Sequence, residues 1–348
     1  MLLQAFRVLL PILIIAANPL AGEAPYPPSP VIVDIEWAPK SSIQRMADGS
    51  DNFPITWADD GSLYTAYGDG NGFEPKISER LSLGFARVDG PPTNFSAENI
   101  RSNGEQTGHG SDGKKASGML MVDSVLYMWL RNADNNGKKC QLAWSTDHAE
   151  TWTFSDWKFD EFGYCTFINY GQNYAGARDE YVYTVTHDDP SAYDVANHFI
   201  LMRVPKNQIQ DKNAYEFFVS VDANNNPSWS ANVADRGAVF THLDLARRSG
   251  ISYIPGLNRY LWWQQLNYGG EDTRYEGGFG IYDAPEPWGP WTTVYFTQKW
   301  AVRPGETGSV PPKWASEDGK TLYLVFSGDD AFSVRKATLT LADEGPVE

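Results

Sequence analysis

The sequence is poor in positive charge. Its 348 residues include 28 lysines and arginines against 44 aspartates and glutamates, which gives a formal net charge of -16. A chain this acidic repels polyanions overall, so we expect neither nucleic acid nor an anionic membrane surface as its partner. A local basic pocket is still compatible with this balance.

Long apolar runs are also scarce. The one clear run, Val8 to Ala17, follows a single arginine and precedes small residues near Ala24, which is typical of a secretory signal. We therefore expect residues 1–24 to be a signal peptide and residues 25–348 to form a single domain that is secreted or periplasmic. A retained N-terminal anchor is the less favoured alternative. No later stretch of the sequence approaches the length needed to cross a membrane.

Cysteine and metal-binding patterns are sparse. The two cysteines, Cys140 and Cys165, are compatible with one disulfide or with a pair of buried free thiols. The sequence lacks zinc-ligand spacing, a glycine-rich phosphate loop and a Gly-x-Ser-x-Gly elbow. Asp222 to Asn226 alternates oxygen-bearing side chains as calcium loops do, but the later glutamate is missing, so an Asn-rich turn is favoured. We predict no cofactor, and a structural calcium ion is the weaker alternative.

Aromatic residues, glycine and proline are abundant. Aromatics make up 14% of the chain, with 31 glycines and 22 prolines, which suits many short strands joined by tight turns. Asp51 to Asp69 has the pattern of a hairpin: an apolar run, an Asp-Asp-Gly turn and an aromatic-rich run. Antiparallel strands place the start of the first beside the end of the second. Asp51 and Asp69 are therefore expected at the same edge of the sheet.

This hairpin pattern recurs along the chain. Further copies begin near residues 116, 165, 249 and 312. The copies are about 65 residues apart, a spacing that suits one four-stranded blade each, so we predict an all-β, five-bladed β-propeller. An N-terminal strand at 31–35 would complete the last blade beside 334–341 and close the ring. A β-sandwich with longer loops is the alternative.

Ser145 to Trp152 (Ser-Thr-Asp-His-Ala-Glu-Thr-Trp) resembles the Asp-box of sialidase-type propellers, with Ala149 where glycine is usual. In those proteins the motif is a structural turn between outer strands. It therefore supports the fold and is assigned no catalytic role.

The repeat also predicts where a site would lie. In a propeller every inner strand starts at one face and every second strand ends there, so the residues at these positions surround one mouth.

Glycosidic cleavage uses two carboxyl groups, one neutral and one ionised. The candidates for this pair are Asp51, Asp69 and Glu276. The predicted substrate-binding residues are polar, charged or aromatic groups of the same rim: Lys115, Arg131, His187, Asp188, Arg248, Tyr253, Gln264 and Arg274.

We expect Asp51 to act as base or nucleophile, and Asp69 or Glu276 to act as acid. Arg248 and Lys115 would set the ionisation of the acid or hold the substrate. A nearby cation lowers the pKa of a carboxyl and a nearby carboxylate raises it, and this separates the acid from the base.

Several short motifs resemble known glycosidases. The five-bladed count, the aspartate at the first inner strand and Gly289-Pro290-Trp291 resemble propeller glycosidases of the arabinanase and xylosidase kind. The Asp51 to Asp69 hairpin followed by Ser-Leu-Gly-Phe-Ala at 82–86 resembles a bacterial family long known as a domain of unknown function, which includes endo-acting D-arabinan hydrolases. This resemblance covers most of the mature chain. It implies that a pair of aspartates on the first blade are the catalytic carboxylates.

Two other functions stay open at this stage. A polysaccharide lyase acting on uronate polymers would use His187, Tyr253 and Arg248, as propeller lyases of similar design use His, Tyr and Arg. A non-catalytic carbohydrate-binding propeller would bind without forming product. In each case the expected partner is a poly- or oligosaccharide and the expected state is a monomer.

Overall fold

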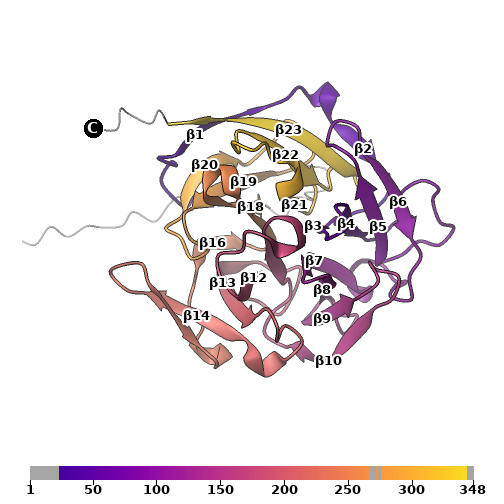
Figure 1. The fold of residues 1–348 in the computed structure, drawn as a ribbon, viewed down its shortest axis with the longest axis horizontal. Coiled ribbons are helices and arrows are strands. Elements are labelled where there is room, and N and C mark those ends of the chain that lie inside the picture. Colours follow the sequence, from indigo (N-terminus) through magenta and orange to yellow (C-terminus); the bar gives the residue numbers. More distant parts are fainter. Residues whose placement is uncertain (1–22, 267–271, 273–275, 343–348) are drawn as a thin grey trace, which may run out of the picture.

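The computed structural model describes residues 23–266, 272 and 276–342. These residues form 23 β-strands and seven short 3-10 helices, with the strands arranged around a central axis (Figure 1). The predicted all-β propeller is confirmed. No helix within the described ranges is long and apolar enough to cross a membrane. The predicted signal peptide falls almost entirely on residues 1–22, outside the described residues, and stays a prediction.

The strand pairings divide into five antiparallel units, each with its inner strand next to the axis. The first two units are β3 (Ile55–Trp57), β4 (Leu63–Tyr67), β5 (Gly84–Asp89) and β6 (Ser96–Ile100), then β7 (Lys115–Val122), β8 (Val125–Arg131), β9 (Cys140–Ser145) and β10 (Thr153–Phe159). The third is β11 (Thr166–Asn169), β12 (Tyr181–His187), β13 (Ala196–Pro205) and β14 (Glu216–Val221), extended by β15 (Pro227–Ser230) and β16 (Phe240–Ala246).

The last two units follow the same order from the axis outward. They are β17 (Ser249–Ile254), β18 (Arg259–Leu266), β19 (Gly278–Ala284) and β20 (Thr292–Thr297), then β21 (Gly308–Ser309), β22 (Thr321–Phe326), β23 (Phe332–Leu341) and β1 (Ile32–Trp37), with β2 (Gln44–Met46) also on β23. The 3-10 helices are η1 (Lys40–Ser42), η2 (Gly110–Asp112), η3 (Gln172–Tyr174), η4 (Lys212–Ala214), η5 (Val233–Asp235), η6 (Pro255–Leu257) and η7 (Pro312–Trp314). The third and fourth units share one sheet because β11 and β17 pair in parallel.

The N-terminal strand closes the ring, as predicted. β1 pairs antiparallel with β23, with Ile35 opposite Leu339, and the two strands lie side by side in Figure 1. Trp37 at the end of β1 packs edge-on against Trp300, with ring centroids 5.1 Å apart. The edge of the last unit is therefore paired with strand rather than left open.

The first hairpin forms as predicted, and its turn explains why. Ile55 lies opposite Thr65, and the connecting turn places Gly61 at φ +88°, a conformation that glycine adopts without strain. The Asp60 carboxylate accepts the Ser62 N–H at 2.8 Å. An Asp-Gly turn with this local bond fixes the register of the two strands.

The fifth hairpin differs from the prediction. Residues 312–314 form the 3-10 helix η7, and the inner strand is the short β21, which pairs with β22 through Gly308 and Phe326. Consecutive prolines explain the shift, since Pro311 and Pro312 lack the N–H groups that a ladder needs. The start of the fifth inner strand therefore lies at residue 308 rather than 312.

Two other sequence motifs have structural roles. Asp147 of the Asp-box accepts hydrogen bonds from Ser145 Oγ at 2.8 Å and Thr151 N–H at 2.8 Å in the turn between β9 and β10. Cys140 and Cys165 are buried free thiols, and the Cys165 N–H donates to Cys140 Sγ at 3.0 Å. Of the two cysteine alternatives, the structure shows the free pair.

Candidate active site

The strand ends bring Asp51 and Asp69 to one mouth of the propeller. Asp51 and Gly68 exchange two backbone hydrogen bonds of 2.8 Å, one in each direction, so Asp69 follows directly after the residue paired with Asp51. A Cβ on Gly68 would lie only 2.8 Å from Asp51 Oδ1. Glycine at this position therefore makes room for the Asp51 carboxyl. The prediction that these carboxyls share one sheet edge is confirmed.

The backbone around this pair is strained. Asn52, Phe53 and Asp69 have φ values of +62°, +122° and +47°, and Asn132 on the second unit has +57°. Positive φ in non-glycine residues costs free energy and is concentrated at functional sites. Here the strained residues hold contacts across the mouth, because Asn52 donates to Asp51 and accepts from Arg131 Nη2 at 2.8 Å.

Lys115 provides the cation for Asp69. The two side chains form an ion pair in which the lysine is almost fully buried and the aspartate is 13% exposed. The Gly110 N–H also donates to Asp69 Oδ2, at 3.3 Å. Lys115 and the Gly110 N–H therefore fix the position of the Asp69 carboxyl at the rim.

A third carboxylate, Glu306, lies at the same mouth and was not predicted. Its Oε2 atom is 2.6 Å from Arg248 Nη1 and 3.7 Å from Arg131 Nη2. The side chain is 19% exposed. Sequence reasoning missed it because the fifth inner strand was placed at residue 312. A search for a polar residue just before the Gly308 strand would have found it.

The surroundings push the two carboxyl groups in opposite directions. Burial first, and then the nearby charge of Glu306, raise the pKa of Asp51 to about 7. Burial alone would also raise the pKa of Glu306, but Arg248 and then Arg131 outweigh it and lower the pKa to about 2. Near neutral pH, Asp51 can hold a proton that Glu306 has lost, and such a separation is what an acid and an ionised partner require.

Arg131 and Arg248 are fully buried between two tyrosine rings. Their guanidinium carbons lie 5.7 Å and 5.6 Å from the Tyr164 ring and 5.4 Å and 5.8 Å from the Tyr193 ring. Cations over aromatic faces are stabilised by the ring quadrupole. The prediction of both arginines at the mouth agrees with this placement, while the two tyrosines were not predicted.

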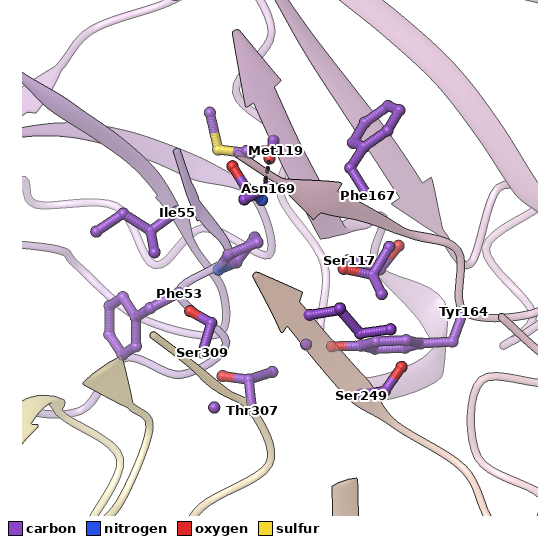
Figure 2. A pocket seen from close by; sticks show the side chains of 15 residues that line it. Phe53, Ile55, Ser117, Met119, Tyr164, Phe167, Asn169, Ser249, Thr307 and Ser309 are labelled. Atoms are coloured by element: carbon purple, nitrogen blue, oxygen red, sulfur yellow. Dashed lines mark hydrogen bonds between the residues drawn. The ribbon is translucent and has the colours of Figure 1, made fainter. Parts of the chain in front are cut away.

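Below this cluster the axis of the propeller is nearly filled. A cavity of about 30 Å³ is lined by residues of all five units, including Tyr164, Ser249 and Thr307. Figure 2 shows these side chains around the cavity. Since such a volume holds only a water or two, a sugar substrate would have to bind at the mouth rather than inside the channel.

Two further predicted residues are buried near the mouth with internal partners. His187 Nε2 lies 2.7 Å from the Ser191 carbonyl oxygen, and burial lowers the histidine pKa to about 4. Gln264 Oε1 lies 3.0 Å from His242 Nδ1, and Gln264 Nε2 donates to the Leu245 carbonyl oxygen at 2.9 Å. These contacts fix the strand ends, so we assign both residues a supporting role.

The remaining predicted residues lie apart from the carboxyl cluster. Asp188 forms ion pairs with Arg236 at 2.8 Å and His198 at 3.0 Å. Tyr253 is five residues beyond Arg248, roughly 16 Å along a strand, and its hydroxyl donates to Asn258 in the turn at the far end of β17. The structure therefore does not bring His187, Tyr253 and Arg248 together, and the predicted lyase trio is wrong in Tyr253.

The predicted acid Glu276 lies between β18 and β19. Its side chain is exposed, whereas the charged groups that shift the pKa of Asp51 are Glu306, Lys115, Asp69 and Arg131. Arg274 lies outside the described residues. The glutamate whose charge acts on Asp51 is therefore Glu306, whereas Glu276 was predicted as one of two possible acids.

Two groups of oxygen- or nitrogen-bearing side chains make hydrogen bonds within their own turns or between neighbouring turns. The Asp222 carboxylate accepts the N–H groups of Asn224 and Asn226, at 2.8 Å and 2.9 Å, which is the geometry of an Asn-rich turn. Asp59 and Asp60 of the turn between β3 and β4 cluster with His148 of the turn between β9 and β10. There His148 Nε2 already lies 2.7 Å from Asp59 Oδ1.

No family model matches the chain, and no curated protein sequence matches it. Solved structures do resemble it. One, described as a candidate hydrolase from Bacteroides ovatus, has a TM-score of 0.51 at 12% identity, covering 88% of this chain and 93% of that one. A GH43_1 enzyme from Xanthomonas citri has a TM-score of 0.48 at 12% identity, covering 88% and 97%.

An alpha-L-arabinofuranosidase from Podospora anserina has a TM-score of 0.48 at 11% identity, covering 90% of this chain and 99% of that one. At these identities the likeness concerns the fold. The resemblance to the family of endo-D-arabinan hydrolases stays a prediction.

Proposed function

We propose that the protein is a glycoside hydrolase in which Asp51 is the proton donor and Asp69 is the base or nucleophile. The observation that carries this proposal is the carboxyl cluster itself: a buried aspartic acid with a pKa of about 7 beside carboxylates held by cations. This exchanges the roles expected from the sequence, because burial favours the protonated form of Asp51.

In the proposed reaction Asp51 transfers its proton to the glycosidic oxygen as the bond from that oxygen to the anomeric carbon breaks. The Asp69 carboxylate either takes a proton from the attacking water or forms a bond to the anomeric carbon that water later breaks. Lys115 holds Asp69 in place. Glu306 is a positioning residue, because its negative charge favours the protonated form of Asp51.

We also propose the setting in which this activity operates. The substrate is a poly- or oligosaccharide. Residues 1–24 direct the protein out of the cytoplasm, and the exported protein acts as a monomer. The axial cavity is too small to hold a sugar, which supports binding of an extended chain across the mouth. The propeller fold shared with a candidate hydrolase from Bacteroides ovatus is compatible with this function, although the fold alone does not determine it.

The test incubates the mature protein with neutral and uronate-containing polysaccharides while new reducing ends and ultraviolet absorbance are followed together. Reducing ends without absorbance are expected, because a hydrolase forms no unsaturated uronate. Rising absorbance would instead identify a lyase. Binding without either signal would identify a carbohydrate-binding protein.

The first variant to test is Asp51→Asn, which should lower kcat by at least about a thousandfold because the proton donor is lost. Asp318→Asn is the matched control, since Asp318 lies in the turn before β22 and bonds only locally to Ser316 and the Lys320 N–H. The control should keep full activity. A fully active Asp51→Asn variant would remove Asp51 from the mechanism.

A further inference from the structure

Among the residues that the structure describes, the mouth holds more positive than negative charge. Lys115 is matched by Asp69, but three arginines, Arg131, Arg247 and Arg248, interact with the single carboxylate of Glu306. With Asp51 protonated, this leaves an excess of about two positive charges in a protein whose net charge is -16. Buried charge without a counterion is costly.

Several guanidinium donors in this cluster are unused. Arg131 Nε and Nη1, Arg248 Nε and Nη2, and Arg247 Nε are buried and make no hydrogen bond within the described part of the chain. Arg131 is the last residue of β8, and Arg247 and Arg248 are the two residues before β17. Unpaired donors at one point, with surplus positive charge, have the chemistry of an anion site.

We infer that the substrate of the proposed hydrolase carries an anionic group, a carboxylate, sulfate or phosphate on the sugar, which binds to Arg131, Arg247 and Arg248. That the anionic sugar is hydrolysed rests on the proposed function. That it binds to the three arginines does not. The pKa of Arg247 agrees with it, because burial and then the charge of Arg248 lower that pKa to about 10, and an anion would relieve the repulsion.

Tyr193 lies over two of the three arginines. Its ring covers Arg131 and Arg248 from the loop between β12 and β13, and its hydroxyl accepts a hydrogen bond from Asn132 at 3.0 Å. Arg247 is only partly buried, so an incoming anion meets it first.

The test measures binding by calorimetry with the Asp51→Asn protein, which does not consume its ligand. The probes are galactotriose and trigalacturonate, which differ by the oxidation of C6, together with a sulfated and a phosphorylated galactotriose. We expect at least one anionic probe to bind at least about tenfold more tightly than galactotriose, with an affinity that falls as salt rises. The three anionic probes distinguish carboxylate, sulfate and phosphate.

Arg247→Gln in the same background should remove most of this preference for the anionic probes. Arg303→Gln is the matched control, because Arg303 is 51% exposed and paired with Asp329 at 2.7 Å. It should keep the preference. Equal binding of all four probes, no binding of the anionic ones, or a preference that survives Arg247→Gln would each overturn the inference.

The two proposals can fail separately. Hydrolysis of neutral polymers by a protein that does not bind the anionic probes would retain the hydrolase and overturn the anion site. Tight binding of trigalacturonate that Arg247→Gln abolishes, with no polymer cleaved, would retain the anion site and overturn the hydrolase.

Discussion

Asp51 and Glu306 differ because their neighbours differ. Both are carboxyl groups of the same mouth, yet Glu306 lies 2.6 Å from Arg248 while Asp51 is buried and repelled by Glu306. Near neutral pH, the raised pKa of Asp51 keeps part of this carboxyl protonated and able to donate a proton. Activity that needs this proton should therefore fall as the pH rises through about 7.

Replacing Glu306 by glutamine should move this alkaline limit to lower pH. The substitution removes the negative charge that raises the pKa of Asp51 and leaves Arg248 and Arg131 beside it, so that pKa should fall by about one unit or more. The measurement is kcat/KM against pH. Glu216→Gln, which breaks an outer Arg203–Glu216 pair of 2.8 Å, is the control. An alkaline limit that stays in place would show that Glu306 does not set the ionisation of Asp51.

At the scale of elements, the inner strands approach closely because they carry small residues. A Cβ on Gly250 of β17 would lie 2.3 Å from the Gly308 carbonyl oxygen of β21. These two strands belong to neighbouring units, so this contact sets how tightly the ring closes. The position of Glu306, two residues before Gly308, depends on it.

Gly250→Ala should therefore destabilise the fold by about 1–3 kcal/mol, since the added methyl forces the inner strands apart. Urea unfolding measures the change. Ser249→Ala is the control on the same strand, because the Ser249 hydroxyl makes no hydrogen bond in the described ranges, and it should unfold like the parent. Equal stability of both variants would mean that the inner ring can adjust.

The strand β1 closes the ring between the first and last parts of the chain. A mature protein that lacks residues 25–38 should unfold at a lower temperature and aggregate, because the loss of β1 leaves the β23 edge unpaired. Circular dichroism and size-exclusion chromatography follow these changes. A synthetic peptide of residues 25–38 should restore stability. Unchanged unfolding of the truncated protein would show that β1 contributes little.

At the scale of the whole molecule, the charges are divided between the surface and the mouth. The net charge is -16, yet the mouth gathers Lys115, Arg131, Arg247 and Arg248. Lys115 and Arg131 come from the second unit, and Arg247 and Arg248 directly precede the fourth, so the basic pocket forms only when these units pack together. The site therefore forms only when the chain folds, and burying these charged groups lowers the free energy of unfolding.

This cost gives the stability a characteristic pH dependence. The pKa of Asp51 rises from 3.8 in the unfolded chain to about 7 in the folded one, so the folded state keeps a proton that the unfolded state has lost. This contribution is favourable at low pH and is lost as the pH rises through that window.

Between pH 5 and pH 7, the parent should therefore lose on the order of 2 kcal/mol of stability relative to Asp51→Asn, which cannot titrate at this position. Glu306 is ionised throughout this range because its pKa is about 2. Urea unfolding of both proteins at each pH gives the difference. A constant difference would contradict a raised pKa for Asp51.

Much of the fold was predictable because its signals are local. Four of the five hairpins and the N-terminal closing strand lie where alternation and turn residues placed them. The fifth inner strand was misplaced because β21 has only two residues, too few to show a pattern. Because of this misplacement, Glu306 was not predicted as a residue of the mouth. Tyr164 and Tyr193 were missed because a tyrosine over a guanidinium has no signature in the sequence.

The sequence by itself determined that Asp51 and Asp69 meet, because a tight hairpin fixes which residues face each other within about twenty positions. Only the tertiary structure decided which of the many charged rim residues converge and which carboxyl keeps its proton. Both depend on distances between units far apart in the chain and on burial, which set the Coulomb and desolvation free energies. The same residues on an open sheet would titrate as ordinary surface groups.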